Sequence, residues 1–324
     1  MEKISVLLAV YKPNRTFFRK QLDSINKQTY KNIELIVMDD SDDREEFNQI
    51  SSIINEHITN IDYKVYANES NIGSNRTFEK LTQIADGDFF AYCDQDDIWE
   101  EYKIETLVNE IKKENAVVCY SDLSVIDEDD QQISDSFKKM SKRLNHVYGD
   151  KQYSYFLRRN SITGCTMLIH GDIAKQSLPF PKNNEYVHDH WLTLYASCKG
   201  RVAYVEKPLI RYRIHSNNQI GAKVLDGIGN KKDYIEKKLY IEKAKIDFVK
   251  SSSIGNENSD IEKEIKAFED FVSTRLAFFQ NKNLSNTIAF LKLLKLDPTL
   301  ILFELLVNIS PNLISNKVIA FSKK

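Results

Sequence analysis

Short apolar runs alternate with segments of helical spacing along the first part of the chain. Residues 4–10 form a continuous apolar, β-branched run, which is typical of a strand covered on both faces. Residues 17–28 show the spacing of an amphipathic helix, and residues 33–38 form a second buried strand that ends at Asp39 and Asp40. This pattern predicts a βαβ unit.

The same alternation continues towards the middle of the chain. It predicts helices over residues 47–58, 75–85 and 104–112, strands over 63–67, 89–93 and 117–120, and a polar segment over 127–142. Strands that alternate with helices indicate an α/β fold, here a Rossmann-like, mostly parallel sheet flanked by helices.

The pattern changes after Gly221. Residues 231–250 and 259–280 have helical spacing and are joined by a Ser/Asn/Gly-rich linker. We therefore expect two domains in the 324-residue chain: a catalytic α/β domain over 1–221 and a helical C-terminal region over 222–324.

Charge and cysteine content narrow the class of protein. The formal net charge is −2, with an acidic first domain and a basic C-terminal region, and an acidic main domain argues against nucleic acid as a partner. Cys93, Cys119, Cys165 and Cys198 lack paired spacing, which is typical of reduced thiols in the cytoplasm. The apolar run at the N-terminus is short and lacks a cleavage site, so we interpret it as a strand.

Ligands of open α/β sheets bind beyond the carboxyl ends of the strands, and polar residues cluster there in this sequence. The candidates at these ends are Ala9, Tyr11, Asp39, Asp40, Asn68, Asn71 and Asp94. Asn71, Gly73 and Arg76 directly precede a predicted helix whose N-terminus could face a diphosphate. An ordinary turn followed by a Ser74 cap explains the same residues equally well.

The acidic run Asp94-Gln95-Asp96-Asp97 directly follows the strand over 89–93. Carboxylates at the end of a strand, set one residue apart, suit a hard cation such as Mg²⁺ or Mn²⁺ that also binds a diphosphate. A solvated acidic turn is the alternative, although Trp99 argues against it. The cluster predicts a metal site.

Seven segments, taken in order, resemble family-two glycosyltransferases with the A-type fold. They are SVLLAVYKPN, ELIVMDDSDD, NESNIGSNRTFEK, FFAYCDQDDIWE, TGCTMLI, HDHWL and YRIHSNN, and the agreement extends over roughly residues 4–221. The run DQDDIW is most similar to bacterial rhamnosyltransferase-type members. The resemblance does not extend into the C-terminal region.

The resemblance implies a donor site. Ala9, Tyr11 and Asp40 correspond to positions that hold the nucleotide base and ribose, and Asn71 and Arg76 to positions near the diphosphate. A packed aromatic side chain at a strand end is the alternative for Tyr11.

The resemblance also implies a metal site. It places Asp94 near the ribose or diphosphate and makes Asp96 the direct metal ligand, with Asp97 as an alternative ligand. His215 corresponds to a further contact with the metal or the diphosphate, and an imidazole suits Mn²⁺ better than Mg²⁺.

Asp189 corresponds to the catalytic base of the family, where Glu-Asp is the commoner pair and His188 replaces the Glu here. An inverting transfer needs one carboxylate to remove the proton of the acceptor hydroxyl. A helix N-cap is the alternative role for Asp189. Residues 163–166 resemble a segment that lines the acceptor or donor-sugar pocket, although packing explains their small size as well.

The expected function is therefore an inverting, metal-dependent transfer of a sugar from a nucleotide diphosphate to a glycan or lipid-linked acceptor in bacterial surface polysaccharide synthesis. By resemblance alone, dTDP-rhamnose is the first donor expected and a UDP-hexose the second. A nucleotidyltransferase is disfavoured because residues 11–14 form no Gly-rich loop. An inactive scaffold would not need Asp40, Asp96 and Asp189 together, and a receiver-like signalling module would be much shorter.

Residues 287–296 and 299–309 are apolar stretches with Lys292 and Lys295 on the first. Neither reaches the roughly 20 apolar residues that cross a bilayer. They suit either a helix in the membrane interface, which would place the enzyme at the inner face of the cell membrane, or a helical hairpin packed on the catalytic domain or on a second subunit in a homodimer.

Overall fold

The computed structural model describes residues 1–141, 144–182, 185–215, 227–256 and 258–322. The chain divides into two compact units, Met1–Ser216 and Asn217–Lys324. The domain boundary predicted at Gly221 lies outside the described residues.

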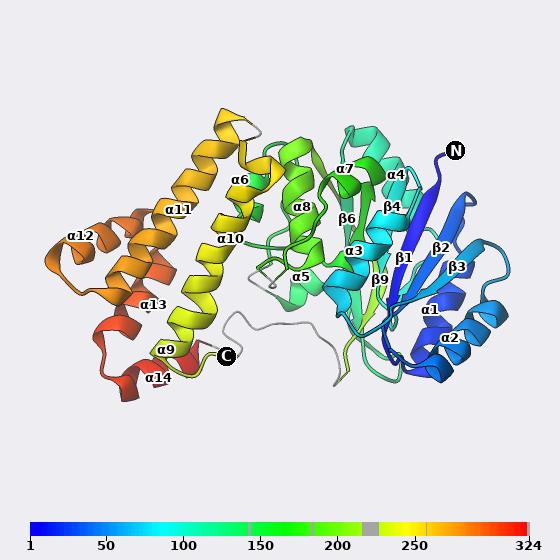
Figure 1. Ribbon diagram of the computed structural model, residues 1–324, viewed down its shortest axis with the longest axis horizontal. Helices are drawn as coiled ribbons and strands as arrows, with labels where there is room; N and C mark the ends of the chain where they lie inside the picture. The colour runs from blue at the N-terminus through cyan, green and yellow to red at the C-terminus, as the bar shows by residue number, and fades with distance from the viewer. Residues whose placement is uncertain (142–143, 183–184, 216–226, 257, 323–324) are drawn as a thin grey trace. The chain divides into compact units, whose positions relative to one another are not determined.

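The first unit is built on one mixed sheet (Figure 1). Its strands are β1 (Ile4–Val10), β2 (Ile33–Asp39), β3 (Asp62–Ala67), β4 (Phe89–Cys93), β5 (Ile98–Trp99), β6 (Val118–Ile126), β7 (Gln132–Ser134), β8 (Met167–His170) and β9 (Val202–Arg213). The strand order is β3-β2-β1-β4-β8-β6-β9-β5, and β7 pairs with β6.

The N-terminal half of the sheet is parallel, as the sequence pattern predicts. β1 pairs in parallel with β2 and β4, and β2 pairs in parallel with β3. All residues of β2 and β4 are buried, whereas β3 alternates between partly buried and exposed positions as the outermost strand. The carboxyl ends of β1, β2 and β4 therefore lie at one edge of the sheet.

The C-terminal half contains antiparallel pairs, which the alternation of apolar runs does not reveal. β8 lies between β4 and β6 and is antiparallel to both, while β6 and β9 form a long parallel pair with register shifts. The predicted α/β fold is confirmed. The antiparallel pairs of the C-terminal half are a feature that the sequence pattern does not predict.

Helices flank the sheet of the first unit (Figure 1). They are α1 (Arg15–Asn26), α2 (Arg44–His57), α3 (Ser74–Ile84), α4 (Lys103–Glu114), α5 (Phe137–Met140), α6 (Tyr153–Phe156), α7 (Gly171–Gln176) and α8 (His188–Lys199), with a 3₁₀ turn η1 (Gly164–Thr166). Side-chain caps start α1 and α2, where Asn14 and Asp43 each accept two backbone N–H groups of the first turn.

Two local expectations are corrected. The polar segment over 127–142, for which the sequence pattern predicts neither strand nor helix, contains β7 and α5 among its described residues, because its pairing with β6 is a tertiary contact that local polarity does not reveal. Ser74 does not cap α3: the N-cap is Gly73, with φ 81° and no side-chain hydrogen bond.

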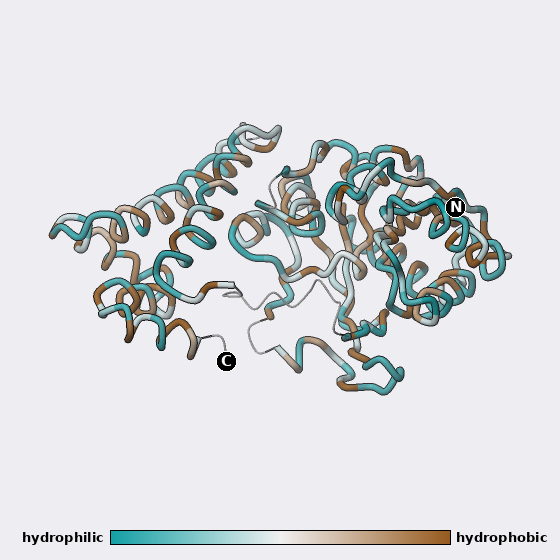
Figure 2. The backbone as a smooth tube through the Cα atoms, turned by 60° about the horizontal axis from the view of Figure 1, so that its bottom comes forward, coloured by the Kyte–Doolittle hydropathy of each residue, from teal (hydrophilic) through white to brown (hydrophobic). Residues whose placement is uncertain are grey.

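The second unit is helical. It contains α9 (Lys231–Tyr234), a π-helical turn η2 (Ile235–Leu239), α10 (Tyr240–Ser251), η3 (Ser253–Asn256), α11 (Ser259–Gln280), α12 (Leu284–Lys292), η4 (Leu293–Lys295), α13 (Pro298–Ile309) and α14 (Asn312–Phe321). Hydrophobic and hydrophilic residues follow one another every few positions along these helices (Figure 2). In the part of the chain that the structure describes, no helix is long and apolar enough to cross a membrane.

Candidate active site

The parallel register brings the predicted nucleotide-binding residues to one edge of the sheet. Val10 of β1 pairs with Asp39 of β2, and Leu8 pairs with Cys93 of β4. Just beyond this edge, Gln95 binds both backbone groups of Tyr11: its Oε1 accepts the Tyr11 N–H at 2.8 Å and its Nε2 donates to the Tyr11 carbonyl at 3.2 Å. The Tyr11 side chain is 46% exposed, so the predicted base contact has an accessible ring.

Asp40 lies buried at the end of β2 and joins it to the N-terminus of α3. Its Oδ1 accepts from the Ile72 N–H at 2.9 Å and from Asn68 Nδ2 at 2.8 Å, and its Oδ2 accepts from the Gly73 N–H at 2.8 Å. The carboxylate thus satisfies backbone donors that precede the helix. Both of its oxygens already hold protein partners.

Arg76 and Asn71 lie at the same helix start but differ in their surroundings. The Arg76 guanidinium pairs with Glu79 and donates to the Phe180 carbonyl at 3.3 Å. Its charge is therefore balanced by a protein carboxylate. Asn71 is exposed, one residue before the backbone that Asp40 binds.

The acidic loop between β4 and β5 is anchored to the end of β9. His215 Nε2 lies 2.8 Å from Asp96 Oδ2, so the two predicted metal ligands are adjacent. Buried Arg213 holds the loop: its backbone N–H donates to Asp97 Oδ1 at 3.1 Å and its Nε donates to the Asp96 carbonyl at 2.9 Å.

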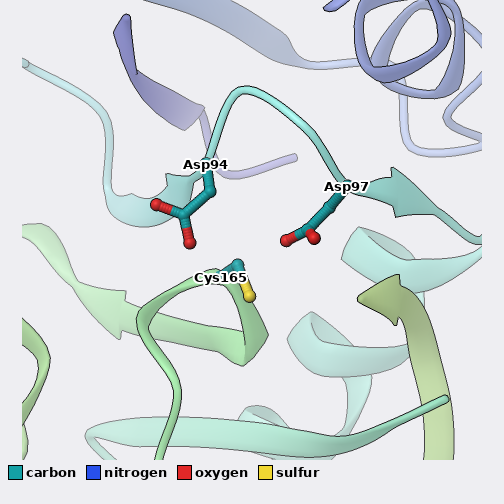
Figure 3. Close-up of side chains that lie close together, drawn as sticks. All are labelled: Asp94, Asp97 and Cys165. Carbon is teal, nitrogen blue, oxygen red and sulfur yellow. The ribbon is translucent and has the colours of Figure 1, made fainter. Parts of the chain in front are cut away.

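Asp94 and Asp97 point towards each other and towards Cys165 of η1 (Figure 3). One ligand atom of each residue lies within 4.8 Å of the others. Burial, followed by the charges of Asp96 and Asp189, raises the pKa of Asp94 to about 7. The pKa of fully buried Asp97 is also raised, mainly by burial.

Lys103 places a basic group beneath this loop. It is fully buried, and its Nζ lies 3.0 Å from the centre of the Trp99 ring, without a hydrogen-bond partner among the described residues. Burial lowers the pKa of Lys103 to about 7, although the neighbouring carboxylates act in the opposite direction. A positive charge here would offset part of the repulsion between Asp94 and Asp97.

Asp189 lies in the first turn of α8, and Val187, not Asp189, is the N-cap. Its carboxylate accepts from the His190 N–H at 2.5 Å, from Asn160 Nδ2 at 3.1 Å and from the Gly164 N–H at 3.2 Å. Burial raises the pKa of Asp189 to about 6, and these three hydrogen bonds limit the rise. A carboxylate with this pKa is ionised at neutral pH and still basic enough to accept a proton.

His188, which replaces the commoner Glu, packs as a neutral aromatic side chain. Its ring centroid lies 4.1 Å from that of Phe78 and 5.7 Å from that of Tyr92. Burial lowers the pKa of His188 to about 3. Gly164 lies so close that a Cβ added there would stand 2.6 Å from His188 Nε2, which explains the small residue in this segment.

The acidic loop and Asp189 belong to the same site. The charge of Asp189 contributes to the raised pKa of Asp94, and Gly164, which binds Asp189, directly precedes Cys165. The side chains present fit a divalent cation. The carboxylate of Asp96 lies next to the imidazole of His215, and the negative charges around Asp94 would be neutralised by a bound cation.

Four residues that position this site escape the sequence analysis: Gln95, Lys103, Asn160 and Arg213. Lys103 does leave a signal, because it is a charged residue on the otherwise apolar buried face of α4. Gln95 and Arg213 lie inside motifs that the sequence analysis names, but no role is predicted for them, because their partners and those of Asn160 are distant in sequence.

Comparison with known proteins agrees with the geometry. Residues 5–171 match the family model described as Glycosyl transferase family 2. An uncharacterised glycosyltransferase of Rickettsia typhi is 28% identical over 223 residues, which is 65% of this chain and 64% of that protein's length. The dTDP-rhamnosyl transferase RfbG of Shigella flexneri is 28% identical over 163 residues, 47% of this chain and 53% of the relative.

Among solved structures, residues 1–349 of S. aureus TarS in complex with UDP-GlcNAc share the fold. The TM-score is 0.59 at 14% sequence identity, covering 99% of this chain and 90% of the TarS chain. The A-type fold predicted from the sequence is thereby confirmed.

Proposed function

Because this chain belongs to glycosyl transferase family 2, we propose that it transfers a sugar from a nucleotide diphosphate to a glycan or lipid-linked acceptor in bacterial surface polysaccharide synthesis, with inversion at the anomeric carbon. The observation that carries the proposal is that η1 joins the two halves of the site: its Gly164 binds Asp189, and its Cys165 lies within 4.8 Å of Asp94 and Asp97 in the loop that also holds the Asp96–His215 pair. We propose that residues 1–221 perform the transfer and that residues 222–324 serve for contact with other molecules.

Asp189 acts as the general base. It removes the proton of the acceptor hydroxyl while that oxygen forms a bond to the anomeric carbon, and the bond from that carbon to the diphosphate oxygen breaks on the opposite side. The raised pKa of Asp189 suits this role, and its hydrogen bonds to Asn160 and Gly164 orient the carboxylate.

The donor nucleotide lies along the edge formed by β1, β2 and β4. Tyr11 and Ala9 contact the base and ribose, Asp40 shapes the adjoining backbone, and Asn71 and Arg76 border the diphosphate. Asp96 and His215 would hold Mg²⁺ or Mn²⁺, with Asp94 beside them, and that cation would neutralise the charge that develops on the departing diphosphate.

The donor we propose is dTDP-rhamnose. The name of the S. flexneri relative, a dTDP-rhamnosyl transferase, and the DQDDIW run both support rhamnose. A UDP-hexose is the alternative, because the TarS structure contains UDP-GlcNAc.

A donor screen tests the proposal. We expect dTDP-rhamnose with Mn²⁺ to raise the melting temperature more than UDP-glucose or UDP-GlcNAc, and to release dTDP in a reaction that EDTA stops. Asp96→Ala should reduce release at least 100-fold, as expected when a metal contact made in the transition state is lost.

The matched control is Asp62→Ala, which removes an exposed carboxylate from β3 far along the sheet from the loop. Its activity should equal that of the unaltered protein. A preference for a UDP-hexose would show that the donor is a UDP-hexose and not dTDP-rhamnose. Release of pyrophosphate from a nucleoside triphosphate and a sugar phosphate would indicate a nucleotidyltransferase. No turnover of any donor would refute the enzymatic role.

We also propose that the second unit contacts an anionic lipid surface at the cytoplasmic side of the membrane. Leu302, Leu306 and Ile309 form one stripe along α13 and are 52%, 50% and 59% exposed. Leu313 and Phe321 of α14 are 73% and 79% exposed. Such apolar side chains on the surface are typical of a contact site.

Charge favours lipid over a second copy of the chain. Exposed lysines accompany the apolar positions, namely Lys292, Lys295 and Lys317. A basic apolar surface complements anionic headgroups, whereas two copies would bring like charges together.

Liposome flotation distinguishes these partners. The full chain should float with anionic but not with neutral liposomes, and Leu302→Ser/Leu306→Ser should lower the bound fraction at least fivefold. Ile133→Ser, which removes a side chain of similar exposure from β7, should have no effect. If the full chain dimerises but does not float, and the double variant does not dimerise, this result would favour the homodimer and contradict lipid binding.

A further inference from the structure

Aromatic side chains gather at the junction of β6, β9 and the segment that precedes α6. The ring of Tyr204 stacks on His146 at a centroid distance of 4.4 Å and an angle of 17°, and on Tyr148 at 5.9 Å and 20°. Tyr120 of β6 packs against the same Tyr204 ring at 4.9 Å. We call Tyr148, Tyr204, His146 and Tyr120 the aromatic platform.

Hydrogen bonds hold the platform in place. Gly149 and Val202 form a two-way bridge, in which the Gly149 N–H donates to the Val202 carbonyl at 2.7 Å and the Val202 N–H donates back at 3.0 Å. The Tyr120 hydroxyl donates to the Val147 carbonyl at 3.0 Å. Tyr148 is thereby fixed over Tyr204 before any ligand arrives, and preorganisation of this kind lowers the entropic cost of binding.

The ring of Tyr148 is the exposed side of the platform. Tyr148 is 60% exposed although its ring already stacks on Tyr204. The outer face of a ring that the protein already supports from behind is available to stack on a ligand.

Polar atoms behind the exposed ring lack partners among the described residues. They are both ring nitrogens of His146 and the hydroxyl of Tyr204. Asp122 Oδ1 lies 3.8 Å from His146 Nε2, which is too long for a hydrogen bond. These atoms are free to bind water or the hydroxyl groups of a ligand.

The platform lies beside the proposed base. Tyr120 of the platform pairs with Met167 of β8, three residues after Gly164, whose N–H donates to Asp189 at 3.2 Å. Ser161 lowers the pKa of Tyr120 and of Tyr155, in both cases against the larger effect of burial. The preceding residue, Asn160, donates to Asp189 at 3.1 Å.

A second connection runs through α6. His190 Nε2 lies 2.6 Å from the carbonyl oxygen of Phe156, the neighbour of Tyr155, and His190 directly follows Asp189. The contact from Gly164 connects Tyr120 of the platform to the residue that would receive the acceptor proton. The contact from α6 connects a segment next to the platform to the residue that follows Asp189.

We propose that the aromatic platform is an acceptor subsite that binds a neutral pyranose ring. The C–H-rich face of a pyranose packs against the negative face of an aromatic ring, and its hydroxyls can bind the unpartnered polar atoms. The subsite positions the acceptor hydroxyl towards Asp189. This inference rests on the proposed function, because it assigns the acceptor side of the same reaction.

Saturation-transfer NMR with maltotriose and cellotriose as probes, in the presence of UDP and Mn²⁺, tests the subsite on the full chain. We expect saturation transfer to at least one trisaccharide, reduced at least fivefold by Tyr148→Ala and kept by Tyr148→Trp. Tyr102→Ala, which removes a 47% exposed tyrosine elsewhere in the same unit, is the matched control and should keep the signal.

Release of nucleotide from the donor in the same samples separates the two proposals. Tyr148→Ala should leave the hydrolysis of donor without acceptor unchanged, because Tyr148 stacks on Tyr204 of β9, whereas β1, β2 and β4 form the donor edge. No saturation transfer to either probe, or transfer that Tyr148→Ala does not reduce, would overturn the subsite even if hydrolysis proceeds. If the unaltered protein does not hydrolyse any donor, this result would instead refute the proposed function.

Discussion

At the scale of single residues, Asp189 owes its proposed chemistry to opposing effects. Burial disfavours the charged form, whereas hydrogen bonds from Asn160, Gly164 and His190 favour it, and the pKa settles at about 6. An exposed aspartate would be a weaker base, and a buried one without these donors would hold its proton at neutral pH.

The rate of transfer should therefore depend on pH through Asp189. Because the base acts only when deprotonated, kcat/KM should be level above about pH 7 and fall tenfold per pH unit below about pH 5. Asn160→Ala removes a hydrogen bond to the carboxylate and should move the acid limb to higher pH. A pH series of initial rates with donor and metal saturating measures both effects.

The control for this series is Asn55→Ala, whose side chain binds Tyr63 at the surface. Its profile should match that of the unaltered protein. An Asn160→Ala profile with an unmoved acid limb would show that Asp189 does not set the pH dependence.

At the scale of elements, two connections hold the site together: Asp40 joins β2 to the start of α3, and Gly164 joins η1 to the start of α8. In both, an acidic residue accepts backbone N–H groups from a distant segment. Such contacts decide where the helices begin relative to the sheet edge.

Asp40→Ala should destabilise the protein and weaken donor binding together. Loss of the carboxylate leaves the N–H groups of Ile72 and Gly73 without their acceptor, which costs about 1–3 kcal/mol. Urea unfolding measures the free energy of unfolding, and titration with dTDP measures affinity. Glu69→Gln, an exposed change in the same segment, should alter neither, and an Asp40→Ala protein of unchanged stability would contradict the capping role.

Gly164→Ala should slow transfer about 100-fold while nucleotide binding persists, because displacing a base by about 1 Å can cost this much. The added Cβ would stand 2.6 Å from His188 Nε2 and 3.4 Å from Asp189 Cβ, so the start of α8 must shift. Gly229→Ala serves as the control, since its added Cβ meets only an ordinary contact at 3.4 Å. Steady-state rates equal to those of the unaltered protein would contradict a tightly placed base.

At the scale of the whole molecule, each of the two compact units has an interior of its own. The helical unit is organised around a buried ion pair, in which Arg275 Nε lies 2.9 Å from Glu304 Oε2 and the Tyr234 hydroxyl donates to Glu304 Oε1 at 2.6 Å. Arg275 and Glu304 are both fully buried. The stability of the helical unit therefore depends on the Arg275–Glu304 ion pair, which lies entirely within that unit.

Arg275→Met should destabilise the helical unit by about 3–5 kcal/mol, because it leaves Glu304 as a buried, unpaired charge. We expect a separate unfolding transition at lower temperature in calorimetry, with donor hydrolysis unchanged below it. Lys266→Met, which removes an exposed ion pair with Asp270, should shift unfolding by less than about 1 kcal/mol. A single transition in Arg275→Met that lowers both stability and hydrolysis would show that the units are coupled.

Much of the catalytic unit follows from the sequence. The run over residues 4–10 predicts β1 at its observed bounds, and the runs before Asp40 and Asp94 predict β2 and β4, because a strand buried on both faces needs a continuous apolar segment. The carboxylates that follow these strands are found at one edge because neighbouring parallel strands end together.

The partners of those carboxylates are decided only by the tertiary structure. Asp40 binds backbone 32 and 33 residues away, Asp189 binds Asn160 29 residues away, and His215 meets Asp96 across 119 residues. Local periodicity carries no information about such distances, because a residue's own neighbours determine its secondary structure while the packing of separate elements determines its contacts. For the same reason, the sequence determined which residue types could do chemistry in this protein, and the fold decided that Tyr148 stacks on Tyr204 and that Asn160 binds Asp189.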